Sequence, residues 1–142
     1  MYNILLADDD LDDCIFFKEA INELQISAQI TTVHDGQQLM HLLNKMEQLP
    51  HVLFLDLNMP RRNGIECLSI IKSNEKLKQL PIVIFTTSID SELVKPLFEQ
   101  GAQYYVRKPN EFSQIIKVIN EALHFINENC LMKLTKTEHE FN

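Results

Sequence analysis

Short apolar runs rich in Val, Ile, Leu and Phe alternate with longer stretches of helical period along most of this chain. The strongest runs are apolar on both faces, which is typical of strands buried between two layers of helices in a parallel sheet. Right-handed crossovers between such strands place helices on both sides of the sheet. The alternation therefore predicts an α/β fold, a doubly wound (βα)5 three-layer sandwich, with strands over 4–7, 29–33, 52–55, 82–85 and 104–106.

The expected order of these strands across the sheet is 2-1-3-4-5, the flavodoxin-like arrangement of a five-stranded parallel sheet. In this order, strands one and three flank the point at which the strand order reverses. Ligands of open parallel sheets bind at that point, outside the carboxyl ends of the strands. We therefore expect the functional residues to follow the strands directly.

The helices expected between the strands each carry an apolar stripe at helical spacing. The first is expected from about Asp12 to Leu24, and in the third Ile65, Leu68 and Ile70 are expected to face the sheet. The other expected stripe residues are Ile15, Phe16, Ala20 and Leu24 in the first helix, Leu39, Leu42, Leu43 and Met46 in the second, and Ile115, Ile116, Ile119, Leu123 and Ile126 in the last.

The fourth helix contains a conflict between Ser91 and Pro96. A proline beyond the first turn removes a hydrogen bond and costs about 3 kcal/mol. Either the helix begins late, with Pro96 near its first position, or its start is irregular. Ser91 as a cap and Pro96 at the start of a regular helix are incompatible.

Length and composition limit the domain organisation and the class of partner. With 142 residues the chain is the size of one domain, expected over 1–129, followed by a short polar C-terminal tail over 130–142 and no output domain. The net charge of −7 leaves no basic surplus for nucleic acid. No apolar run approaches the roughly 20 residues that cross a bilayer, so no membrane partner is expected. Three scattered cysteines indicate reduced thiols and a cytoplasmic protein.

Polar residues suited to one site follow the strong strands. Asp8 and Asp9 follow the first strand, Asp56 the third, Thr86 ends the fourth, and Lys108 follows the fifth. Three carboxylates in one crevice repel one another, and a hard divalent cation such as Mg²⁺ relieves this repulsion. An aspartate can itself attack phosphorus to form an aspartyl phosphate, and Asp56, at the end of the central strand, is the best candidate. A hydroxyl and an ammonium would bind the phosphoryl oxygens.

Simpler interpretations account for part of this acidic sequence. Asp10, Asp12 and Asp13 lie near the expected start of the first helix, where negative charge is favourable, and we assign them to capping and the first turn. Singly, Asp56 could be a loop residue and Lys108 a surface lysine. Their joint placement at the strand ends favours a shared site.

At these residues the sequence resembles the receiver domain of bacterial response regulators, the family that includes the chemotaxis response regulator. The resemblance covers about residues 2–129 and rests on four motifs in the family's order and spacing. The motifs are ILLADDD (4–10), LFLDLNMPRRNG (53–64), PIVIFTTS (81–88) and GAQYYVRKP (101–109). The LNMPRRNG loop is most similar to small stand-alone receivers, including those paired with phytochrome-type sensor kinases.

The resemblance implies a role for each site residue. Asp56 would be the phosphoacceptor, Thr86 the switch hydroxyl, Lys108 the phosphoryl-binding lysine and Tyr105 the aromatic that changes exposure on activation. The ion would be Mg²⁺, with Mn²⁺ as an alternative. The implied metal ligands are Asp9 directly, Asp8 mainly through water, Asp56, and Asn58 through its backbone carbonyl.

Several positions depart from the common pattern of the family or bear on its backbone. Asn110 stands where an apolar residue is frequent, Thr87 is bulkier than the usual neighbour of the switch threonine, and Pro96 falls on the face that receivers commonly use for dimers and targets. The Lys108–Pro109 peptide is usually cis in the family. These departures leave the implied chemistry intact but bear on the output surface.

The function implied by the resemblance is that of a single-domain response regulator in a two-component phosphorelay. A sensor histidine kinase or histidine phosphotransfer protein would supply the phosphoryl group, and the helix 4–strand 5–helix 5 face would carry the signal to an unknown protein target. Monomer and phosphorylation-dependent homodimer are both open, and a phosphate sink or relay intermediate is the alternative role. No turnover of small molecules is expected.

Three other classes fit the sequence less well. A phosphohydrolase with an aspartate nucleophile needs a second Asp two residues after the nucleophile, where this chain has Asn58. A nucleotide-binding module needs a Gly-rich loop after the first strand, and the whole chain has only three glycines. A degenerate receiver that acts only by docking is disfavoured by the intact acidic set.

Overall fold

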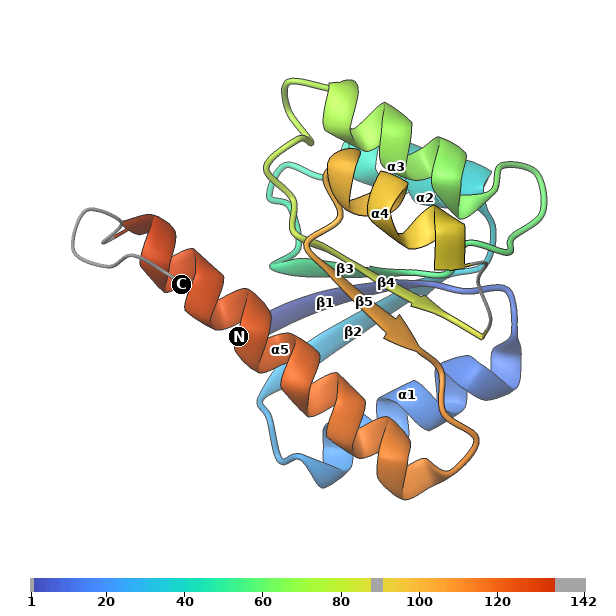
Figure 1. Ribbon diagram of the computed structural model, residues 1–142, viewed down its shortest axis with the longest axis vertical. Coiled ribbons are helices and arrows are strands. Elements are labelled where there is room, and N and C mark those ends of the chain that lie inside the picture. Colours follow the sequence, from blue (N-terminus) through green and yellow to red (C-terminus); the bar gives the residue numbers. More distant parts are fainter. Residues whose placement is uncertain (1, 88–90, 135–142) are drawn as a thin grey trace.

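The computed structural model describes residues 2–87 and 91–134, with side chains up to residue 128. Strands and helices alternate through the whole of this part (Figure 1). The strands are β1 (Tyr2–Ala7), β2 (Ala28–Val33), β3 (Val52–Leu55), β4 (Ile82–Thr86) and β5 (Tyr104–Arg107). The helices are α1 (Leu11–Glu23), α2 (Gly36–Lys45), α3 (Gly64–Ser73), α4 (Ser91–Glu99) and α5 (Phe112–Leu134).

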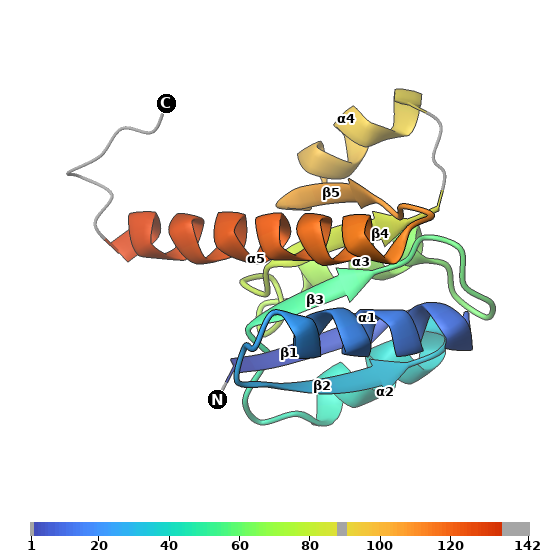
Figure 2. The same cartoon turned by 90° about the horizontal axis from the view of Figure 1, so that it is seen from below.

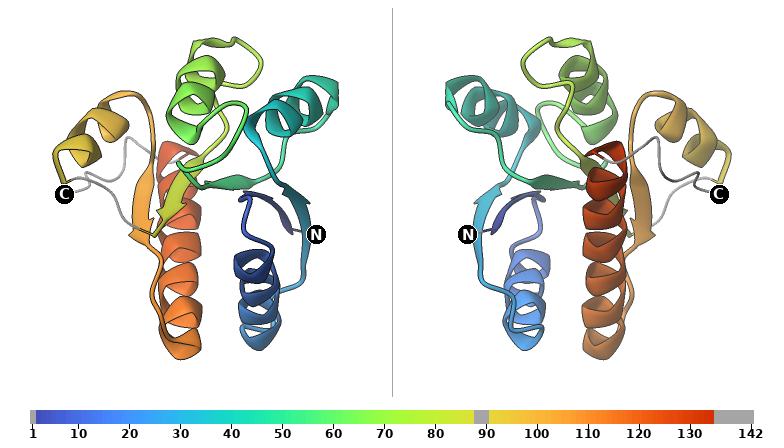
Figure 3. Two further views of the ribbon diagram at one scale, coloured as in Figure 1. Left: turned by 90° about the vertical axis from the view of Figure 1, so that its right-hand side faces the viewer. Right: turned by 90° about the vertical axis from the view of Figure 1, so that its left-hand side faces the viewer.

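The sheet has the predicted topology. Its five strands lie in the order β2-β1-β3-β4-β5 and every neighbouring pair is parallel. Helices α1 and α5 cover one face, and α2, α3 and α4 cover the other (Figure 3). The flavodoxin-like (βα)5 sandwich is confirmed.

Each face of the sheet packs its own apolar core. Leu39, Leu43 and Leu68 belong to the core beneath α2, α3 and α4. On the other face Phe17 of α1 packs edge-on against Phe54 and Phe85, with ring centroids 4.8 and 5.8 Å away. Side chains of β3 and β4 alternate between the two cores, which explains why these strands are apolar throughout.

Two of the predicted helix stripes are partly wrong. In α1, Ala20 is buried as predicted, but Phe17 and Ile21 are also buried, whereas Ile15 and Phe16 are 51% and 43% exposed. In α3, Leu68 is buried as predicted, but Ile71 is buried in place of Ile70, which is 37% exposed. Both errors arise where apolar residues are adjacent in the sequence, because spacing alone then leaves the inward residue undetermined. Packing against the side chains of the sheet determines which of the adjacent residues faces inward.

Helix α4 begins before Pro96, so the alternative of a late start is wrong. Pro96 lies inside the helix on its exposed side, while the neighbouring Leu97 is buried. The end of the helix remains hydrogen-bonded, since the Gln100 amide donates to the Pro96 carbonyl at 2.9 Å. The helix therefore continues through Pro96 to Glu99.

Helix α5 is longer than expected, and continues past residue 129 to Leu134. Its C-terminal part projects beyond the amino ends of the strands (Figure 2). The first part of the expected polar tail is thus helical, and residues 135–142 lie outside the described residues. Within the described chain, no helix combines the length and the apolar character needed to span a membrane.

Candidate functional site

The carboxyl ends of β1 and β3 bring three carboxylates together. Asp8 and Asp9 follow β1, Asp56 follows β3, and the two strands pair directly. Asp8 and Asp56 are buried and Asp9 is exposed. Carboxylate oxygens of the three residues lie within 4.8 Å of one another. This is the cluster that the sequence predicted.

The loop after β3 fixes the orientation of Asp56. The Asn58 amide donates to Asp56 Oδ1 at 3.1 Å, and the Gly64 amide donates to the Leu57 carbonyl at 2.9 Å. Gly64 lies so close to the strand end that a Cβ atom there would stand 2.7 Å from the Cα of Leu57 and overlap the Asp56 carbonyl oxygen. The absence of a side chain at residue 64 is what lets the loop fold back beside Asp56.

Helix α3 begins at this loop with a complete capping box. The Asn63 side chain accepts from the Glu66 amide at 2.9 Å, and the Glu66 carboxylate accepts from the Asn63 amide. Two backbone donors at the start of the helix are satisfied in this way. The end of the loop is therefore fixed by local sequence.

The outer side of the same loop is tied to α2. Asp35 caps α2 by accepting from the Gln38 amide at 2.8 Å, and its other oxygen pairs with Arg61 at 2.8 Å. The Gln38 hydrogen bond and the Arg61 guanidinium hold the pKa of Asp35 below its ordinary value. Arg61 adopts a left-handed backbone conformation (φ 67°), and the Arg62 carbonyl lies against Gly36 where a Cβ would collide with it.

Thr86 reaches the acidic cluster from the end of β4. It is fully buried, and its hydroxyl donates to Asp56 Oδ1 at 2.8 Å. Asp56 Oδ1 thus accepts from both Thr86 and Asn58. The predicted switch hydroxyl lies beside the predicted phosphoacceptor.

Lys108 reaches the same cluster from the loop after β5. Its ammonium contacts Asp8 Oδ2 at 2.6 Å and Asp56 Oδ2 at 3.2 Å, and its side chain is only 6% exposed. The Lys108 amide also donates to the Thr86 carbonyl at 2.8 Å, which aligns the loop with β4. No cis peptide occurs among the described residues, so the expected cis Lys108–Pro109 bond is wrong. The trans form of such a bond is favoured by about 0.5–1 kcal/mol.

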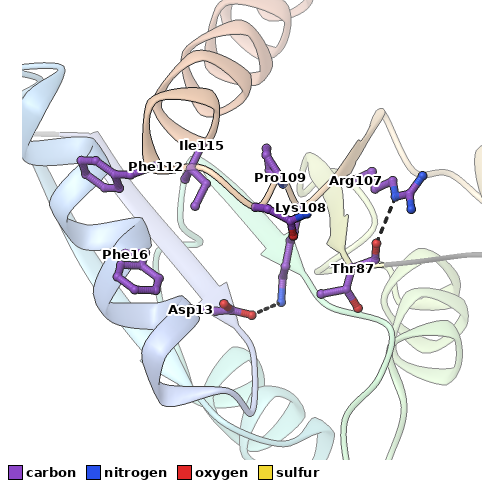
Figure 4. A pocket seen from close by; sticks show the side chains of 9 residues that line it. Asp13, Phe16, Thr87, Arg107, Lys108, Pro109, Phe112 and Ile115 are labelled. Atoms are coloured by element: carbon purple, nitrogen blue, oxygen red, sulfur yellow. Dashed lines mark hydrogen bonds and ion pairs between the residues drawn. The ribbon is translucent and has the colours of Figure 1, made fainter.

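Asp13 is the site residue that sequence reasoning missed. Its Oδ2 lies 2.8 Å from the Lys108 ammonium, although the sequence assigned it to the first turn of a helix (Figure 4). Asp10 is the residue that caps α1, accepting from the Asp13 amide. Asp13 lies one turn before the buried Phe17 and therefore on the same face of α1. A prediction that had placed Phe17 inward would also have placed Asp13 toward the site.

Burial dominates the electrostatics of the site. It raises the pKa of Asp8 to about 7, against the hydrogen bond from Lys108, which lowers it. Burial also disfavours a charged Lys108, but the hydrogen bonds to Asp13 and Asp8 outweigh this and leave the pKa of Lys108 above its ordinary value. The single ammonium of Lys108 faces the carboxylates of Asp8, Asp13 and Asp56. Carboxylate oxygens gathered in this way suit a hard divalent cation.

The other residues singled out in the sequence lie in two places around this site. Tyr105 is partly buried against the core on the α2–α3–α4 face of the sheet. Thr87, Lys108 and Asn110 line an open cavity of about 570 Å³ between α1 and the start of α5 (Figure 4). The exposed Thr87 thus forms part of the entrance to Lys108.

The family model described as "Response regulator receiver domain" matches residues 4–120. The chain belongs to this family. The receiver is 29% identical over 121 residues to Response regulator Rcp1 of Synechocystis sp., covering 82% of each chain. It is 31% identical over 106 residues to the probable chemotaxis protein CheY of Rhizobium etli, covering 75% of this receiver and 80% of that protein.

Solved structures of phytochrome-associated and related regulators resemble this receiver closely. The phosphorylated cyanobacterial phytochrome response regulator RcpA is 27% identical with a TM-score of 0.82, covering 90% of this chain and 95% of that one. The Mn²⁺-bound form of Rcp1 is 28% identical with a TM-score of 0.77, covering 84% and 89%. The receiver thus has both the fold and the family that its motifs indicated.

Proposed function

We propose that this receiver accepts a phosphoryl group on Asp56 from a phosphohistidine, in a reaction that depends on Mg²⁺. The observation that carries the proposal is the arrangement around one buried carboxylate. Asp56 Oδ1 accepts from Thr86, and Oδ2 faces the Lys108 ammonium at 3.2 Å. A hydroxyl donor and a cation thus flank the carboxylate that would accept the phosphoryl group, and they are available to the phosphoryl oxygens over which negative charge is spread during transfer.

The residues present fit the metal that the family uses. Asp8, Asp9 and Asp56 supply oxygen ligands within 4.8 Å of one another, and the Asn58 carbonyl is proposed as a further ligand. Burial raises the pKa of Asp8 to about 7, and a divalent cation beside it would favour the charged form of this carboxylate. Bound there, Mg²⁺ or Mn²⁺ would offset the negative charge of the carboxylates and of an incoming phosphoryl group.

In the transfer step, a carboxylate oxygen of Asp56 forms a bond to phosphorus as the phosphorus–nitrogen bond of the phosphohistidine breaks. The electron pair of that bond stays on the imidazole nitrogen. Lys108 holds an equatorial phosphoryl oxygen, and Thr86 stands within reach of a second one. The buried position of Asp56 excludes bulk water from the nucleophile.

We infer that Thr86 and Tyr105 convert this event into a change of surface. The Thr86 hydroxyl turns from Asp56 Oδ1 to a phosphoryl oxygen, and Tyr105 moves toward the space that Thr86 leaves. Tyr105 lies in β5 opposite Ile84, two residues before Thr86 on the neighbouring strand. The move alters the α4–β5–α5 face, where Leu93 and Phe98 of α4 are 40% and 43% exposed and available to a target or to a second copy.

The phosphodonor is proposed to be a sensor histidine kinase or a histidine phosphotransfer protein that docks beside α1. The cavity next to Lys108 opens there, between α1 and α5 (Figure 4). Phe16 and Phe112 at its rim are 43% and 37% exposed. These rings give a protein partner apolar surface next to the site of transfer.

The test is labelling of the purified receiver with acetyl phosphate and Mg²⁺. We expect one acid-stable, alkali-labile phosphoryl group in the parent protein and background labelling in Asp56→Asn. Asp12→Asn serves as a matched control, because Asp12 is an exposed acidic residue in the first turn of α1. Equal labelling of Asp56→Asn and the parent would contradict the assignment.

A further inference from the structure

The Lys108 ammonium is shared among three carboxylates. It contacts Asp8 at 2.6 Å, Asp13 at 2.8 Å and Asp56 at 3.2 Å. An ammonium has three N–H donors, so these contacts use its full donor capacity. A phosphoryl oxygen on Asp56 can gain a hydrogen bond from Lys108 only if one of the three contacts is given up.

The distances indicate which contact is exchanged. The contact to Asp56 is the longest of the three, and phosphorylation removes the charge of that carboxylate. Asp8 belongs to the cluster of carboxylates that fits a metal ion, so an ion there competes with Lys108 for its oxygens. Asp13 lies outside that cluster, and it is the acceptor of Lys108 that neither the metal nor the phosphoryl group engages.

Asp13 also connects two elements that are far apart in the chain. It lies in the first turn of α1, and Lys108 lies in the loop between β5 and α5. Figure 4 shows the two side chains meeting across the cavity between these elements. The Asp13 side chain is 29% exposed, whereas that of Lys108 is 6% exposed.

We propose that Asp13 is a positioning residue for Lys108, holding the ammonium in place while its contact with Asp56 is exchanged for one with the phosphoryl group. The inference rests on the proposed function, since it concerns the same transfer. Asp13 itself does not touch the reacting atoms. Its removal therefore slows the reaction only through Lys108.

A double-mutant cycle tests this dependence. Asp13→Ala, Lys108→Ala and the double variant are compared with the parent by initial rates of labelling from acetyl phosphate at saturating Mg²⁺. Asp13→Ala is expected to slow labelling about ten-fold in the presence of Lys108, the effect of a misplaced positioning group. In the Lys108→Ala protein the same substitution is expected to have no effect.

The control is Asp12→Ala, which removes a neighbouring exposed charge from the same helical turn and is expected to leave the rate within about two-fold of the parent. If Asp13→Ala does not fold, as judged by its thermal unfolding, Asp13→Asn takes its place because it keeps the shape of the side chain.

The outcomes separate the two proposals. If the parent is labelled, the role of Asp13 is overturned, and the proposed function is not, by any of three results for Asp13→Ala. These are no effect on the rate, a higher rate, and an equal slowing with and without Lys108. A parent that does not label overturns the proposed function, and the role of Asp13 falls with it.

Discussion

The Asp56 carboxylate is held by its neighbours in one orientation. Its Oδ1 accepts from the Asn58 amide and the Thr86 hydroxyl, and its Oδ2 lies 3.2 Å from the Lys108 ammonium. The three donors come from the loop after β3, the end of β4 and the loop after β5. The Asn58 amide can reach Asp56 only if the backbone after β3 turns back toward the strand end. Gly64 makes that path accessible, because its amide bonds to the Leu57 carbonyl without a side chain between them.

We predict that Gly64→Ala reduces both stability and phosphoryl acceptance. The new methyl group would meet backbone atoms of Asp56 and Leu57, which cannot rotate away, and overpacking of this kind costs about 1–3 kcal/mol. Urea unfolding and acetyl phosphate labelling measure the two effects. Gly101→Ala is the control: an alanine would be strained at the φ of 115° that Gly101 adopts, but its nearest contact would be the Lys72 side chain, so this variant should lose stability and keep labelling. A fully labelled, fully stable Gly64→Ala would contradict the argument.

At the residue scale, sequence predicted those members of the site that follow a strand directly. Asp8, Asp9, Asp56 and Lys108 were placed correctly because the carboxyl ends of parallel strands meet at one edge. Asp13 was not, since its place depends on the rotation of α1 about its axis. That rotation is set by Phe17 packing against Phe54 and Phe85, a contact between residues far apart in the chain.

At the element scale, the existence and order of the helices and strands followed from the alternation of apolar runs. The faces of α1 and α3 did not follow, because adjacent apolar residues satisfy more than one stripe. The course of α4 did not follow either, since Pro96 is compatible with two starts. In the structure Pro96 lies inside α4, and the next residue, Leu97, is buried in the core.

We predict that Pro96→Ala stabilises the protein. Alanine restores an amide donor to the helix interior and removes the clash of the proline ring with the preceding turn. Part of this gain is offset because alanine leaves the unfolded chain freer. A net increase of about 1–2 kcal/mol in the unfolding free energy is expected from urea denaturation. Lys95→Ala, an exposed neighbour in α4, should change stability little, and an unchanged or less stable Pro96→Ala would contradict the prediction.

At the scale of the whole molecule, repulsion within the acidic cluster is expected to oppose folding, and a bound cation is expected to relieve it. The chain carries a net charge of −7, and three of its carboxylates are gathered within 4.8 Å of one another. Lys108 contacts Asp8 and Asp56, but one ammonium does not compensate three carboxylates, and the remaining repulsion costs folding free energy. We therefore expect the proposed ion to offset this cost, and we expect the stability of the metal-free protein and its affinity for metal to change in opposite directions.

We predict that Asp9→Asn is more stable than the parent without metal and less stabilised by it. Asp9 is exposed, so its substitution removes repulsion without opening the core. Mg²⁺ should raise the thermal unfolding midpoint of the parent. At an Mg²⁺ concentration one hundred times the dissociation constant, the expected gain in unfolding free energy is about 2.7 kcal/mol. In Asp9→Asn this rise should be largely lost, with KCl at matched ionic strength as the control. An equal rise in both proteins, or none in the parent, would show that these carboxylates do not form the ion site.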